Sequence, residues 1–210
     1  MGRVARSAFE WMVICHEPNH GPHMTKRTGT WRASTDEDVA PADARVAWTL
    51  AARPMLLAAA EHYGDFVTYK DLAAVVQRDA DIYTTQRMDA WIGNVLDAVA
   101  KECADKGEPL LSAFCVRANQ TVGAGYAQSV LDVYGITPAD PDMHAAEERF
   151  KGHVFFGAEM PADGGRAKLP PVTARRRARE RAAVPRVVRP MCPNCFVELP
   201  VNGPCGLCAE

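Results

Sequence analysis

One segment of the chain shows a regular pattern of apolar positions over several helical turns. Between Thr84 and Gly107, apolar side chains recur at steps of three and four along one continuous stripe: Met88, Trp91, Ile92, Val95, Leu96, Val99 and Cys103. This spacing matches the 3.6-residue period of an α-helix that buries one face. Thr84 or Thr85 is suited to cap the start of the helix, and Gly107 is suited to end it. The pattern predicts a long amphipathic helix in a folded core.

Two further helices are predicted before this one. The first runs from about Pro41 to Gly64, and Pro54 must either kink it or open a second helix. Residues 66–68 then read as a short strand. Thr68 follows as the cap of the next helix, because an acidic residue stands three positions later, as in a capping box.

After the long helix the pattern predicts a β-hairpin and a last helix. Residues 110–116 read as one strand, residues 122–126 as the returning strand, and two glycines lie in or next to the turn. A final helix is expected roughly from Asp142 to Met160. The predicted class is therefore α+β and mostly helical, and the order helix, short strand, helix, long helix, hairpin is that of a winged-helix core.

The stretch FVTYKDLA, at residues 66–73, resembles the opening of the winged-helix domain of DNA alkyltransferase-like proteins. The Pro-Cys-His-Arg active-site motif of that family is absent, because Cys115 stands between Phe114 and Val116. The resemblance therefore implies a fold and not alkyl-transfer chemistry.

In such a fold the hairpin is the wing that contacts phosphate, and its candidate nucleic-acid contacts are Arg117, Asn119 and Gln120. The exposed side of the long helix carries acidic residues, among them Asp97 and Glu102, which disfavour deep insertion into a DNA groove. A core used for protein contacts is the alternative.

Charge divides the chain into unlike parts. Residues 166–189 hold nine basic residues and one acid, a net charge of +8, so the other residues, with 15 bases and 25 acids, carry −10. We expect a flexible leader at 1–40, the core at 41–160, a basic disordered linker at 161–190 with transient helix in TARRRARERAA, and a small module at 191–210. The linker's candidate phosphate contacts are Arg175, Arg176, Arg177, Arg179 and Arg181.

Four cysteines in two Cys-x-x-Cys pairs define the last module: Cys192, Cys195, Cys205 and Cys208. Each pair places two sulfurs on one side of a tight turn, so the two pairs can complete a tetrahedral zinc site with no open position. The segment between the pairs contains Asn202-Gly203, a hairpin-turn signal. The module resembles a short zinc ribbon, and its zinc is expected to be structural. Two disulfides are the alternative.

These features predict a non-catalytic nucleic-acid-binding protein, with DNA rather than RNA as the expected ligand, that binds through the linker, the wing and the zinc ribbon. The alternative is a protein-interaction adaptor in which the acidic core and the ribbon dock partners. No catalytic motif stands out, which favours a non-enzyme. No apolar run suits a membrane span, and free cysteines favour the cytoplasm.

Overall fold

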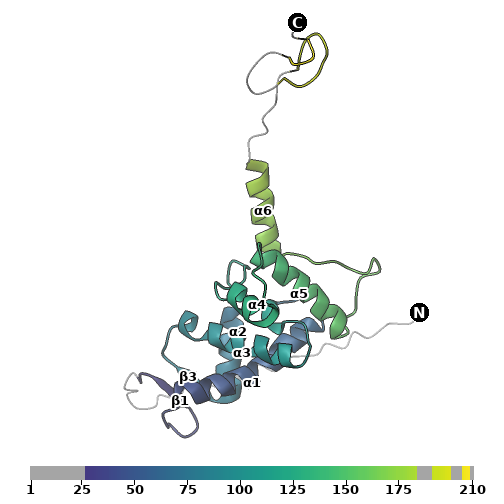
Figure 1. Cartoon of the computed structure of the whole chain (residues 1–210). Helices are drawn as coiled ribbons and strands as arrows, with labels where there is room; N and C mark the ends of the chain where they lie inside the picture. The colour runs from purple at the N-terminus through teal and green to yellow at the C-terminus, as the bar shows by residue number, and fades with distance from the viewer. Residues whose placement is uncertain (1–26, 184–190, 200–204, 209–210) are drawn as a thin grey trace, which may run out of the picture.

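The computed structural model describes residues 27–183, 191–199 and 205–208. Most of the predicted leader, the linker residues 184–190 and the expected turn at Asn202-Gly203 lie outside the described residues. The described part is mostly helical with short strands, which confirms the predicted α+β class (Figure 1).

The described residues form six α-helices, four short strands and two 3-10 turns. The helices are α1 (Pro41–Ala60), α2 (Tyr69–Ala80), α3 (Ile92–Asp105), α4 (Tyr126–Tyr134), α5 (Pro141–Phe155) and α6 (Pro171–Ala183). The strands are β1 (Thr30–Arg32), β2 (Val67–Thr68), β3 (Ile82–Thr84) and β4 (Cys115–Val116), and the 3-10 turns are η1 (Met88–Ala90) and η2 (Leu111–Phe114). Strand β1 pairs antiparallel with β3, and β2 pairs parallel with β4.

Helix α1 packs against both α2 and α3 and supplies much of the core. Buried residues recur along it at every fourth position: Ala44, Trp48, Ala52, Leu56 and Ala60. Steps of four place these side chains on one stripe of the helix. The Trp48 ring lies 4.3 Å from that of Trp91, and its indole N–H donates to the carbonyl of Ile82 at 2.9 Å. Helix α1 continues through Pro54, which is exposed, so no second helix opens at this residue.

The cap of α2 and the stripe of α3 follow the sequence pattern. The Thr68 Oγ1 atom accepts a hydrogen bond from the Asp71 N–H at 3.2 Å, and the apolar stripe of α3 is buried from Ile92 to Cys103. Helix α3 nevertheless begins at Ile92 and not near Thr84, because residues 82–84 form β3. There Thr84 pairs with Thr30 of β1. Residues 30–32 therefore form a strand, although residues 1–40 were expected to be a flexible leader.

The hairpin predicted at residues 110–126 does not form. Residues 111–114 make η2, and Cys115-Val116 pair in parallel with β2 instead of with a following strand. All of residues 111–116 are buried, so they lack the alternation of a strand with one exposed face. Tyr126 then opens α4. The antiparallel wing of the winged-helix prediction is therefore replaced by a tight turn and a helix.

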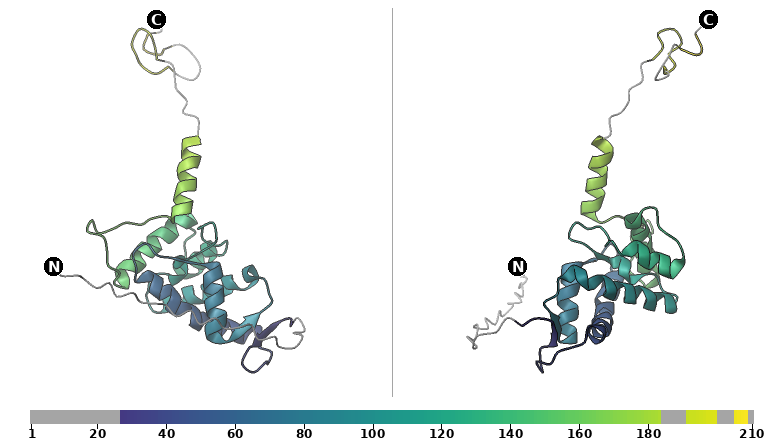
Figure 2. Two further views of the ribbon diagram at one scale, coloured as in Figure 1. Left: turned by 180° about the vertical axis from the view of Figure 1, so that it is seen from behind. Right: turned by 60° about the vertical axis from the view of Figure 1, so that its left-hand side comes forward.

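The last two described helices, α5 and α6, also differ from the sequence prediction. Helix α5 ends at Phe155, and Val154 and Phe155 are exposed, while Glu148 and Arg149 are buried. Residues 171–183, within the linker expected to be disordered, form α6. This helix begins beside the core and extends away from it (Figure 2).

Candidate metal centre and basic helix

The four cysteines of the last module lie together. Their Sγ atoms are all within 4.8 Å of one another, with Cys192 3.9 Å from Cys208 and Cys195 3.4 Å from Cys205. Four thiolates arranged tetrahedrally around an ion at about 2.3 Å would lie roughly 3.8 Å apart. The cysteines are free and not disulfide-bonded. This cluster could hold a metal ion.

The backbone of the first pair forms a tight turn that aims both sulfurs the same way. The Cys192 N–H donates to the Val197 carbonyl, and the Phe196 N–H donates to the Cys192 carbonyl, both at 2.9 Å. Phe196 has a φ of 55°, a left-handed conformation that usually favours glycine. In the second pair, the Cys208 N–H donates to the Cys205 carbonyl at 3.2 Å.

The backbone N–H groups of Cys195 and Asn194 donate to Cys192 and lower the pKa of its thiol to about 6. Contacts with the neighbouring sulfurs raise the pKa of Cys195 and Cys208, so the four thiols do not all ionise readily without a cation. A centre with four thiolate ligands has no open position for water or substrate. The role of a metal ion there would therefore be structural and not catalytic.

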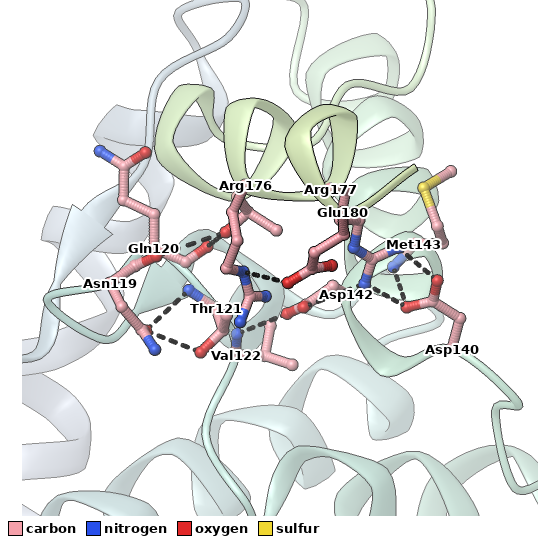
Figure 3. A network of polar contacts seen from close by, with 11 residues as sticks. Asn119, Gln120, Thr121, Val122, Asp140, Asp142, Met143, Arg176, Arg177 and Glu180 are labelled. Atoms are coloured by element: carbon pink, nitrogen blue, oxygen red, sulfur yellow. Dashed lines mark hydrogen bonds and ion pairs between the residues drawn. The ribbon is translucent and has the colours of Figure 1, made fainter. Parts of the chain in front are cut away.

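Helix α6 is fixed to the core at its first turn, by residues that sequence reasoning assigned to nucleic acid (Figure 3). The side-chain oxygen of Gln120 accepts from the Val172 N–H at 2.7 Å, and its backbone carbonyl accepts from the Thr173 hydroxyl at 2.8 Å. Thr173 is completely buried. The Asn119 side-chain oxygen accepts from the N–H and hydroxyl of Thr121. Asn119 and Gln120 thus form the part of the core on which the first turn of α6 rests, here called the seat of α6.

Arg177 makes the second attachment of α6 to the core. Its guanidinium donates to Asp140 at 2.8 Å and to Asp142 at 3.1 Å, and this pairing lowers the pKa of Asp140 and raises that of Arg177 (Figure 3). Asp140 also caps α5 by accepting from the Met143 N–H. Arg177 therefore attaches α6 to the core, and its role as a phosphate contact stays a prediction.

The other predicted arginines of α6 point outward. Arg175, Arg176, Arg179 and Arg181 are all exposed, and the one acid of the helix, Glu180, lies 3.9 Å from Arg176. Arg117 is exposed beside the seat of α6, where it lines the same shallow hollow as Arg177. The structure thus gathers Arg117 and the basic helix on one side of the core.

No protein-family model, no curated protein and no solved structure matches this chain. None of the described helices combines the length and the apolar character needed to cross a bilayer.

Proposed function

We propose that this protein is a non-catalytic nucleic-acid-binding protein whose ligand is duplex DNA, which it binds through α6, with a structural zinc ion in the four-cysteine module. The observation that supports the proposal is the set of four exposed arginines on a helix whose base is attached to the core. A fixed helix holds these charges in set positions, with Arg175, Arg176 and Arg179 on one side of α6 and Arg181 on the other. A flexible linker would have to order them on binding.

The length and charge of α6 suit a polyanion. Its four exposed arginines lie between residues 175 and 181, about 9 Å along the axis, and duplex DNA carries one phosphate for roughly every 1.7 Å of its axis. Four arginines can therefore each reach a separate phosphate. Such contacts release counterions and carry no sequence information, so the binding in this proposal is non-specific.

The core orients α6 in this proposal and does not insert a helix into a groove. Helices α1 to α3 follow one another in the order of a winged-helix domain, but α3 carries Asp97, Glu102 and Asp105, which would repel phosphate. The zinc module would depend on its metal to fold, since so few residues cannot bury enough apolar surface. It would add a second contact with DNA or dock a protein.

The test is the affinity for a labelled 20-base-pair random duplex, measured by fluorescence anisotropy. Changing the exposed set (Arg175, Arg176, Arg179 and Arg181) to Gln should weaken binding by about a hundredfold, roughly 0.7 kcal/mol for each exposed contact. A control with the same change of charge replaces exposed cations elsewhere on the core: Arg45, Lys70, Arg78 and Arg87. Equal loss in both variants would mean that net charge and not α6 drives binding. If the wild-type chain binds neither DNA nor RNA, the result would favour the adaptor function.

A further inference from the structure

A second cavity lies on the core, away from the four cysteines. It has a volume of about 130 Å³ and lies between the end of α1, helix α5 and the segment 166–171 that leads into α6. Aromatic and apolar side chains make up much of its wall, including Tyr63, Phe66 and Phe150. A cavity of about 150 Å³ can admit a benzene ring, so this one suits a group of that size.

Arg149 in the wall of this cavity is a buried cation. Only 5% of the residue is exposed, and one guanidinium nitrogen donates to the Ala113 carbonyl at 2.7 Å. No carboxylate among the described residues lies within ion-pair distance of it. Burial lowers the pKa of Arg149 to about 10, well above neutrality. Asp142 acts on Arg149 only from beyond contact distance, and a buried charge without a contacting counterion is costly for a fold to retain.

The neighbouring acid does not neutralise Arg149. The Glu148 carboxylate is occupied by other donors: the Leu110 N–H at 3.1 Å, the Tyr134 hydroxyl at 2.9 Å and the Lys151 ammonium at 2.8 Å. The remaining guanidinium N–H groups of Arg149 have no partner among the described residues, and they are not sealed in the protein interior. Arg149 lines the cavity, and these donors are the groups of this residue that could bind a molecule within it.

His153, also in the wall, is held neutral. Its Nδ1–H donates to the Ala60 carbonyl at 2.8 Å, and its Nε2 accepts from the Gly64 N–H at 3.1 Å, which assigns the tautomer. Burial lowers the pKa of His153 and outweighs the hydrogen bond to Ala60, which raises it. His153 therefore contributes to the shape of the cavity. The positive charge of the cavity comes from Arg149 and from the segment at the rim.

Two cations of the segment 166–171 stand at the rim. Arg166 is anchored because its N–H donates to the Tyr63 hydroxyl, which donates in turn to the Arg166 carbonyl, both at 2.8 Å. Lys168 places its ammonium 4.7 Å from the centre of the Tyr63 ring. None of the described residues that line the cavity is acidic. The site thus combines an apolar wall with positive charge from Arg149, Arg166 and Lys168.

We propose that this cavity binds a small organic phosphate whose apolar part is no larger than one aromatic ring. The phosphate would accept from Arg149, with Lys168 at the rim, and the ring would contact the aromatic wall. The inference does not rest on the proposed function, because none of the exposed arginines of α6 lines the cavity.

The test is calorimetric titration of the full chain with phenyl phosphate, inorganic phosphate and phenol. We expect saturable one-to-one binding of phenyl phosphate, at least tenfold tighter than either fragment, and a raised melting temperature. Arg149→Met should abolish binding. Lys168→Gln, an exposed change that leaves the core intact, should weaken it about fivefold, while Lys70→Gln should not alter it. No saturable binding, equal affinity for phenol, or an unchanged affinity in Lys168→Gln and Arg149→Met would overturn the proposal.

Discussion

Replacing Arg177 with glutamine tests whether α6 is attached to the core through this side chain. The guanidinium is 21% exposed and Asp142 is 14% exposed, so their contact is partly shielded from water, whereas Asp140 is 40% exposed and is screened more strongly. With that discount the contacts are worth about 1 kcal/mol, less than a fully buried charged hydrogen bond. Such a loss should raise the undocked population of α6 about fivefold.

Hydrogen exchange of the amides in residues 174–183 measures this change directly. Beyond its first turn α6 has no apolar side chain larger than alanine to bury, and an isolated helix of this length is marginal in water. Protection in the Arg177→Gln variant should therefore fall about fivefold. Arg176→Gln is the matched control, because Arg176 is half exposed and contacts only Glu180 at 3.9 Å. Equal protection in the Arg177 variant and the wild type would refute the docking role.

The same contact predicts a dependence of docking on pH. Asp140 has its pKa lowered, first by the hydrogen bond from Arg177, so its contribution is complete above its unfolded-state pKa of about 3.9. The contribution is then lost as the pH falls through the lower folded-state pKa. Protection of α6 should be constant from pH 7 to about pH 5 and should decline below about pH 4. Parallel acid profiles for wild type and Arg177→Gln would contradict this origin.

Three further outcomes are expected. Gly152→Ala should destabilise the core by about 1–3 kcal/mol in denaturant unfolding, because a Cβ there would lie 2.7 Å from the Phe114 ring, whereas Gly93→Ala, with open space, should not destabilise it. Replacing Cys192 and Cys205 together with Ser should abolish zinc binding in a colorimetric assay and leave the melting temperature of the core unchanged. Cys115, which burial keeps protonated by raising its pKa, should react with iodoacetamide at pH 8 only after unfolding, and rapid native-state labelling would contradict this.

Local patterns in the sequence were sufficient for several elements. The stripe of α3 and the cap of α2 depend on residues three or four positions apart, so the periodicity contains the information. The four cysteines were also found from spacing, because two residues between ligands fix a tight turn in almost any context. Their closeness in the structure agrees with that prediction.

The missed features depend on contacts between distant segments. Thr84 looks like a helix cap, but it joins a strand because Thr30, far away in the sequence, pairs with it. Residues 115–116 pair in parallel with 67–68, a choice that no local turn signal indicates. The contacts by which Gln120 and Arg177 attach α6 to the core likewise join segments that are far apart in the sequence. The burial of Arg149 also depends on the distant segments that pack against α5, and its neighbours in the sequence do not indicate it.

The central claim is that the exposed arginines of α6 bind the phosphates of DNA. Its most direct test is the slope of log K against log salt concentration for duplex DNA, from 50 to 200 mM. Four phosphate contacts contribute roughly −3.6 to this slope, about a 150-fold loss of affinity over the range. Changing Arg175, Arg176, Arg179 and Arg181 to Gln should make the slope shallower by about that amount. An unchanged slope in this variant would contradict the account.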